Sequence, residues 1–167
     1  KDKTYEGEVL YQLGFLYIKV KQQKKAVQIF ENYLSTKDKT YVGEVLYQLG
    51  FLYIEAKQQK KAVQIFENYL STKDKTYVVE VLYQLGFLYI EAKQQKKAVQ
   101  IFENYLSTKD KTYVGEVLYQ LGFLYIEAKQ QKKAVQIFEN YLSTKDKTYM
   151  GEVLFRLGYL YLETKQA

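Results

Sequence analysis

The chain has 167 residues and a formal net charge of +6; 47% of its residues are apolar and 26% are charged. This balance is typical of a globular protein rather than a disordered one. There is no cysteine, histidine, proline or tryptophan, so a disulfide framework, a thiolate metal site and the commonest catalytic bases and nucleophiles are excluded. We therefore expect no enzyme, metal or other cofactor. No apolar run reaches membrane-spanning length, so we expect no membrane partner, and no feature indicates a compartment.

A repeat of 36 residues accounts for the whole chain. The third copy differs from the second and the fourth only at Val79, where they have Gly43 and Gly115. A uniform interior between differing ends is typical of a linear array that forms one domain over 1–167. Its predicted units are 1–36, 37–72, 73–108 and 109–144, followed by a terminal helix within 145–167.

The first half of each copy has helical periodicity. In the second copy an apolar row predicts a helix over 39–57, and it consists of Val42, Leu46, Leu49, Tyr53 and Ala56. Either Asp38 or Thr40 is suited to cap its start. Gly50 lies inside this helix and recurs in every copy, which indicates that another helix approaches closely there. Gly43 is replaced by Val79 in the third copy, so we expect neither a positive φ nor a close contact at Gly43.

The second half of each copy predicts another helix. A polar segment is followed by apolar residues at helical spacing, which predict a helix over 59–70: Ala62, Val63, Phe66, Tyr69 and Leu70. The fifth, shorter copy predicts one last helix over 147–165, which would cover the last apolar face of the array. No segment alternates with a period of two, so the predicted class is all-α with nine helices.

These residues resemble the tetratricopeptide repeat at every spacing of its pattern: Leu46, Leu49, Gly50, Tyr53, Ala62, Phe66 and Leu70. The chain departs from the family at four positions, where Trp, a glycine between the helices, a small residue and a proline are usual: Leu46, Lys57, Tyr69 and Asp74. The resemblance implies a right-handed superhelical solenoid of helix-turn-helix repeats. It also implies a protein–protein interaction scaffold.

A second apolar row on the first helix of each copy is the candidate site. Tyr47, Phe51 and Ile54 form this row, which we call the aromatic stripe together with its equivalents, and Glu55 borders it. The resemblance implies that these positions line a concave groove that contacts peptides. The predicted groove residues are Tyr47, Phe51, Ile54, Glu55, Tyr83, Phe87, Ile90, Glu91, Tyr119, Phe123, Ile126 and Glu127. Large side chains in a tight superhelix also pack on their neighbours, so the same row is equally well interpreted as core.

The distribution of charge and the chemistry of the surface indicate which class of partner to expect. Each internal copy carries five lysines and four acidic residues that are interspersed, and arginine occurs once, at Arg156. Phosphate-binding surfaces cluster their cations and favour arginine, so we expect no nucleic acid. The expected partner is an apolar or aromatic protein segment or peptide with basic residues to meet the glutamates.

Two alternatives remain open. The near-identical copies also fit an engineered or recently duplicated array that has no ligand of its own. A self-associating module, which forms a homo-oligomer through its open repeat ends or its groove, is the other alternative.

Overall fold

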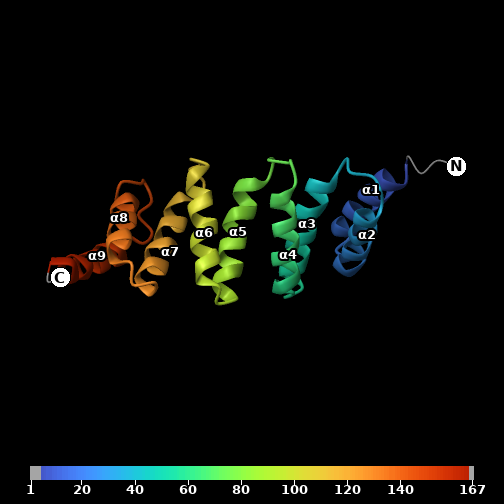
Figure 1. The fold of residues 1–167 in the computed structure, drawn as a ribbon. Helices are drawn as coiled ribbons and strands as arrows, with labels where there is room; N and C mark the ends of the chain where they lie inside the picture. Colours follow the sequence, from blue (N-terminus) through green and yellow to red (C-terminus); the bar gives the residue numbers. More distant parts are fainter. Residues whose placement is uncertain (1–4, 166–167) are drawn as a thin grey trace. The chain divides into compact units, whose positions relative to one another are not determined.

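The computed structural model of the chain describes residues 5–165, and this range forms nine α-helices and no strand (Figure 1). The predicted all-α class with nine helices is therefore confirmed. The helices are α1 (Glu6–Lys19), α2 (Gln23–Ser35), α3 (Val42–Glu55), α4 (Gln59–Ser71), α5 (Val78–Glu91), α6 (Gln95–Ser107), α7 (Val114–Glu127), α8 (Gln131–Leu142) and α9 (Met150–Lys165).

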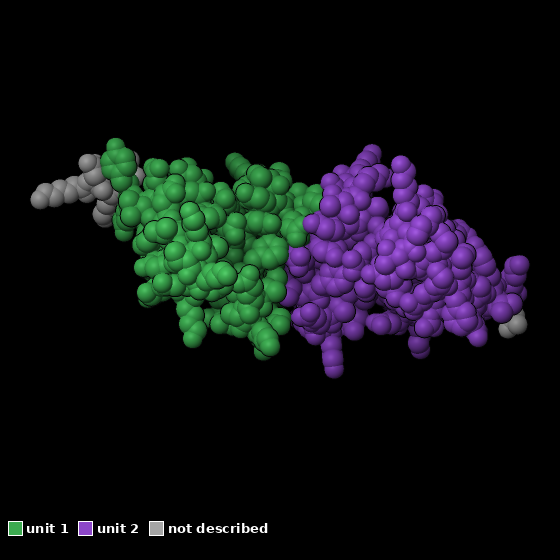
Figure 2. Space-filling model, turned by 180° about the vertical axis from the view of Figure 1, so that it is seen from behind, with its two compact units in different colours: residues 1–81 green, residues 82–167 purple. Residues whose placement is uncertain are grey.

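Consecutive helices pack as helix-turn-helix pairs, with α1 against α2, α3 against α4 and α7 against α8. Helix α3 also contacts α2, α7 contacts α6 and α9 contacts α8, so successive pairs pack on one another within each unit. The chain divides into two compact units, residues 1–81 and residues 82–167, and the boundary lies inside α5 (Figure 2). Neither helix of a pair can bury its apolar face alone, which is why the helices are stable only in tandem.

The turn inside each pair is a Schellman motif with lysine in the left-handed position. Lys57 has a φ of 56°, its amide donates to the Ile54 carbonyl, and the amide of Gln58 donates to the Tyr53 carbonyl at 2.8 Å. Lys21, Lys93 and Lys129 repeat the positive φ. Glycine is usual at this position because it has no Cβ to clash with the neighbouring carbonyl.

The joint between pairs is held by a buried tyrosine rather than by a helix cap. The Tyr69 hydroxyl accepts a hydrogen bond from the backbone amide of Tyr77 at 2.7 Å, and the Asp74 carboxylate accepts one from the Thr76 amide at 2.7 Å. These bonds hold the joint outside the helix, so α3 and its equivalents begin about three residues later than predicted. The predicted cap at Asp38 or Thr40 is wrong, because Tyr41 is the N-cap residue and makes no side-chain cap bond.

The core contact inside each pair is a phenylalanine ring on a glycine. A Cβ atom built on Gly50 would lie 2.2 Å from Cε1 of Phe66, whose side chain is fully buried. Gly14, Gly86 and Gly122 meet Phe30, Phe102 and Phe138 in the same way, which confirms the predicted close approach. A Cβ atom built on Gly158 would meet nothing within 4 Å, because no helix of the described chain covers this position.

The other recurring glycine was predicted incorrectly. A Cβ atom on Gly43 would lie 1.9 Å from Oδ2 of Asp74, and Gly7 and Gly115 meet Asp38 and Asp146 similarly. The expectation of no close contact at Gly43 is therefore wrong for these three copies, although the glycines do avoid positive φ as expected. The contact was missed because its partner is the aspartate of the following joint, which lies beyond the helix pair.

The core is also larger than the predicted apolar row. Val45 and Leu52 are buried although they lie outside that row, whereas Ala56, which was included in it, is exposed. Val45 and Leu52 belong to a second buried face of helix α3. A single-helix periodicity identifies one face, whereas a helix inside a tandem array has neighbours on two sides.

Polar groups in the core are all satisfied within the described residues, where no buried side-chain nitrogen or oxygen lacks a hydrogen-bond partner. The Tyr53 hydroxyl donates to Glu31 on α2, and that of Tyr125 donates to Glu103 on α6. Burial and the neighbouring carboxylate raise the pKa of both tyrosines. Burial also raises the pKa of Tyr33, Tyr69 and Tyr141.

Replacing Gly50 and Gly158 by alanine should have opposite effects on stability. Gly50→Ala should lower the free energy of unfolding by about 1–3 kcal/mol, because its methyl group would clash with a ring that has no room to move. Gly158→Ala should raise it by about 1 kcal/mol, since only the helix propensity changes. Urea denaturation of the two variants, followed by circular dichroism, measures both effects. A shift of the same sign in both variants would contradict this packing.

Replacing Lys57 by glycine should stabilise the protein. A left-handed conformation costs a residue with a Cβ about 1–2 kcal/mol, and glycine recovers part of this because its greater freedom in the unfolded chain offsets the rest. We expect a gain of about 0.5–1 kcal/mol in urea denaturation. Lys57→Ala is the matched control, because it removes the charge and keeps the Cβ, and it should give no gain.

Stability should fall steeply above pH 10. The unfolded chain loses its tyrosine protons near the ordinary pKa of 10, whereas the folded chain retains those of Tyr53, Tyr69 and Tyr125 to a higher pH. The folded state then binds more protons than the unfolded one, so the free energy of unfolding decreases as pH rises past 10 and is unaffected by these groups well below it. Urea denaturation from pH 8 to 12 tests this, and a Tyr53→Phe, Tyr125→Phe variant should show a shallower slope.

Candidate functional site

The aromatic stripe lies at the surface of the described helices, neither fully buried nor free. Tyr47, Phe51 and Ile54 on α3 are all half-buried, while Glu55 beside them is exposed. The same holds for the equivalents on α5 and α7: half-buried Tyr83, Phe87, Ile90, Tyr119, Phe123 and Ile126, and exposed Glu91 and Glu127. The stripe is therefore neither purely core nor purely a solvent-facing groove, because part of each side chain packs inside the protein and part faces solvent.

Each stripe tyrosine stacks on the tyrosine that precedes the next helix pair. The rings of Tyr47 and Tyr77 lie 4.0 Å apart with an angle of 11° between their planes. Tyr11 with Tyr41, Tyr83 with Tyr113, and Tyr119 with Tyr149 repeat this stack at 3.9–4.1 Å. One ring face is therefore used inside the structure, and the tyrosine links one repeat to the next. The sequence signal for this partner is the tyrosine that closes every joint, which sequence reasoning did not use.

The phenylalanine of the stripe connects it to the core. The ring of Phe51 makes edge contacts with Tyr47 at 5.0 Å and with the buried Phe66 at 5.5 Å between centroids. Such edge-to-face pairs contribute about 0.5–1.5 kcal/mol beyond the burial of their area. The stripe is consequently held in one geometry by the fold, and a change at Phe51 disturbs the core as well as the surface.

The stripe hydroxyls of Tyr11, Tyr83 and Tyr119 bind the first glutamate of the next repeat. Tyr11 donates to Glu44 at 2.7 Å and Tyr119 donates to Glu152 at 2.8 Å. Burial and the hydrogen bond to Glu152 raise the pKa of Tyr119 to about 12. The carboxylates of Glu44 and Glu152 therefore already serve as acceptors inside the fold.

The last copy of the stripe differs from the others. On α9 its members are Phe155, Tyr159 and Leu162, and more than half of each side chain is exposed. The guanidinium of Arg156 lies over the ring of Phe123 on α7, 5.4 Å from its centroid. This cation–π contact covers one face of Phe123. A positive charge from α9 therefore lies next to the stripe residue Phe123 of α7.

The bordering glutamates Glu55 and Glu127 lie beside the lysine-rich turn of the preceding pair. Glu127 lines a cavity of about 720 Å³ with the turn at 93–97, and Glu55 lines one of about 890 Å³ with the turn at 21–25. Both positions therefore combine a carboxylate with nearby ammonium groups.

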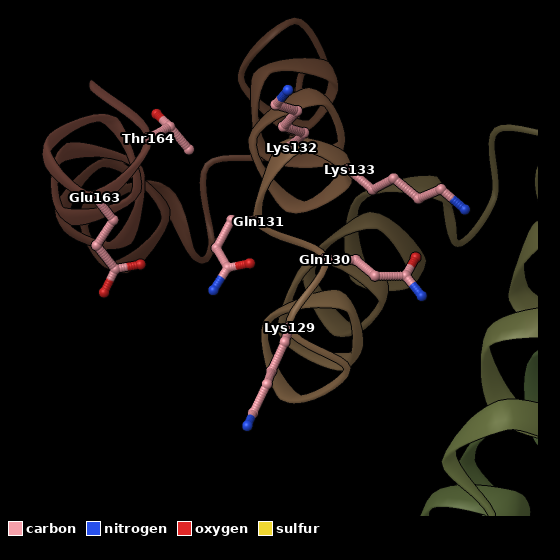
Figure 3. Close-up of a pocket in the computed structure, with 7 residues that line it drawn as sticks. All are labelled: Lys129, Gln130, Gln131, Lys132, Lys133, Glu163 and Thr164. Atoms are coloured by element: carbon pink, nitrogen blue, oxygen red, sulfur yellow. The ribbon is translucent and has the colours of Figure 1, made fainter. Parts of the chain in front are cut away.

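A third cavity of this kind, of about 810 Å³, lies between the turn at 129–133 and Glu163 and Thr164 of α9. In Figure 3 the Gln131 side chain points into this space, whereas Lys129 and Lys133 point away from Glu163. The Lys133 ammonium instead lies over the ring of Tyr125 at 5.4 Å. The lysines do not converge, so this turn has no assembled anion site.

Neither a metal site nor a membrane span is found in the part of the chain that the structure describes. Residues 5–165 contain no group of three or more acidic residues placed to hold a metal ion. Over the same range no helix combines the length and the apolar character needed to cross a bilayer.

Several solved structures share the fold. A tetratricopeptide repeat protein from Parabacteroides merdae ATCC 43184 matches with a TM-score of 0.74 and 20% identity, over 96% of this chain and 63% of its own. MamA from Desulfovibrio magneticus RS-1, residue 41 to its end, matches with a TM-score of 0.69 and 16% identity, over 96% and 86%. YrrB, described as a TPR protein with an unusual peptide-binding site, matches with a TM-score of 0.66 and 18% identity, over 99% and 77%.

Sequence comparison identifies the family. A comparison with curated protein sequences finds no match. A tetratricopeptide repeat profile matches residues 44–72, 80–108 and 116–144, and a second profile of the same repeat matches residues 7–40. Together with the tandem helix pairs, these matches show that the chain belongs to the tetratricopeptide repeat family.

Proposed function

We propose that this chain is a scaffold that binds a peptide-sized segment of a partner protein along the aromatic stripe. Proteins of the tetratricopeptide repeat family generally mediate protein–protein interactions. The observation that carries the proposal is the half-buried state of Tyr47, Phe51 and Ile54 and of their equivalents, which leaves a row of apolar edges in contact with solvent. Apolar and aromatic surface of this kind marks interaction sites.

The rigidity of the stripe supports binding rather than opposing it. Stacking on Tyr77 and edge contact with Phe66 fix the rings of Tyr47 and Phe51 before any partner arrives. A partner then loses less free energy in ordering the side chains that it contacts. On each residue, the packed part of the side chain therefore fixes the ring, and the exposed part is available to contact the partner.

The chemistry around the stripe indicates the partner. Ile54, Ile90 and Ile126 provide apolar contact, and each is followed by an exposed glutamate: Glu55, Glu91 and Glu127. A segment with apolar or aromatic residues next to lysine or arginine matches this pattern, because the cation meets the carboxylate at the rim of the apolar contact. The peptide-binding site ascribed to YrrB, which has the same fold, is consistent with a peptide as the ligand.

A selection from a display library of random 12-residue peptides tests this function. Peptides enriched on the wild-type chain should combine apolar or aromatic residues with lysine or arginine. A variant with Glu55→Gln, Glu91→Gln and Glu127→Gln should bind them several-fold more weakly, since an interfacial charge is lost and the fold is kept. Fluorescence anisotropy with labelled peptides measures the affinities.

The matched control changes the net charge equally at exposed positions of α4, α6 and α8. Gln64→Lys, Gln100→Lys and Gln136→Lys also add three positive charges, and they should leave affinity unchanged within about twofold. Equal weakening in both variants would show only a general charge effect and would contradict the proposed site. Enrichment of no peptide would favour the array without a ligand of its own.

A further inference from the structure

Helix α9 presents to solvent a face that its internal equivalent α7 buries. Leu118 and Tyr125 of α7 are each 4% exposed, whereas Leu154 and Tyr161 at the same positions of α9 are 51% and 39% exposed. The adjacent face of α9 is covered, because Val153, Leu157 and Leu160 are buried. As expected, α9 covers the apolar face of the preceding repeat, but it leaves an apolar face of its own.

The structure itself shows what fits such a face, because α8 covers the equivalent face of α7. Cε1 of Phe138 lies 2.3 Å from where a Cβ of Gly122 would be, and its ring contacts Phe123 edge-on at 5.4 Å. The Lys133 ammonium lies over the ring of Tyr125, and Ala134 is fully buried. A small residue, an aromatic ring and a lysine are thus the recognition elements.

Each receiving position of α7 has a counterpart on α9. Gly158 corresponds to Gly122, and a Cβ atom built on it would meet no other part of the described chain within 4 Å, so the space that receives the phenylalanine ring is present and open. Tyr159 and Tyr161 supply the ring for an edge contact and the ring for a lysine. The charged substitution on this helix, Arg156, is turned toward Phe123 of α7 and leaves this face apolar.

We propose that this face of α9, formed by Leu154, Gly158 and Tyr161, docks an amphipathic helix of a partner protein with the pattern Lys-Ala-x-x-x-Phe-x-x-Tyr. This is the pattern by which α8 binds α7. A second folded copy of this chain does not supply that helix, because its own alanine and phenylalanine are fully buried in every pair: Ala26 and Phe30, Ala62 and Phe66, Ala98 and Phe102, and Ala134 and Phe138. The site is separate from the peptide site proposed on α3, α5 and α7.

A peptide with the sequence of residues 131–142 is the probe. A cross-link between its positions 136 and 140, which are exposed in α8, holds the peptide helical so that ordering does not mask binding. The labelled peptide is titrated with the full chain and followed by anisotropy, and the Gly158 amide is followed by nuclear magnetic resonance. We expect saturable binding and a shift of the Gly158 signal.

Two matched pairs make the experiment decisive. Gly158→Ala should weaken binding by about tenfold or more, because one methyl group fills the space for the ring. Gly151→Ala makes the same chemical change where the equivalent Gly115 has its nearest contacts with Asp146 of the following joint, which the peptide lacks. It should bind within about twofold of the wild type. A peptide with Phe138→Ala should also lose about tenfold or more.

Three outcomes would overturn the proposal. The first is no binding of the cross-linked peptide at about 1 mM. The second is equal binding by the Gly158→Ala and Gly151→Ala variants. The third is a dimer, seen by sedimentation at rising concentration, that Gly158→Ala abolishes, since a second copy would then be the occupant. None of these results alters the binding at the aromatic stripe, which is tested with different residues and different peptides.

Discussion

The contact between a phenylalanine ring and a helical glycine is the constraint on which each repeat depends. At Gly50 the absence of a side chain lets the ring of Phe66 lie against the helix backbone, and no other residue type leaves that space. This contact sets the distance between the helices of a pair. The glycine lowers the intrinsic stability of its helix by about 1 kcal/mol, and the buried ring offsets this by far more. Local helix propensity is therefore subordinate to packing in this chain.

A second set of contacts, made by tyrosine, converts separate pairs into an array. The Tyr69 hydroxyl holds the joint, the Tyr53 hydroxyl crosses to the preceding pair, and Tyr47 stacks on the residue that opens the next helix. The same residue type thus holds the joints between pairs, where no side-chain cap bond is made at the start of α3. Because these hydroxyls are placed to donate or accept as neutral groups, the array depends on protonated tyrosine.

The sequence predicted the fold closely because its information is repeated. The period, the helix number, the helix pairs and the close approach of a second helix at the recurring glycine all follow from spacing within one copy. The helix starts were missed because the Tyr69 hydroxyl and Asp74 act across the joint. The buried Val45 and Leu52 were missed because their neighbours lie in another repeat.

The candidate site was less predictable for a related reason. Spacing located Tyr47, Phe51 and Ile54 on one face, but it could not divide each side chain into a packed part and an exposed part. That division depends on Tyr77 and Phe66, which approach from two different helices or joints. Similarly, the exposed face of α9 has almost the same sequence as a buried face of α7, so only the arrangement of neighbours distinguishes them.

One joint differs from the others although its sequence is the same. Thr36 and Thr72 are extended, whereas Thr108 is helical and Lys109 has a φ of 61°. The bond between the Tyr113 amide and the Tyr105 hydroxyl is nevertheless kept at 2.7 Å. A single heptapeptide, STKDKTY, therefore has two backbone paths between the same fixed ends. Two backbone paths of the same joint are therefore compatible with one anchoring hydrogen bond, so the geometry of the anchor does not depend on the path of the segment between.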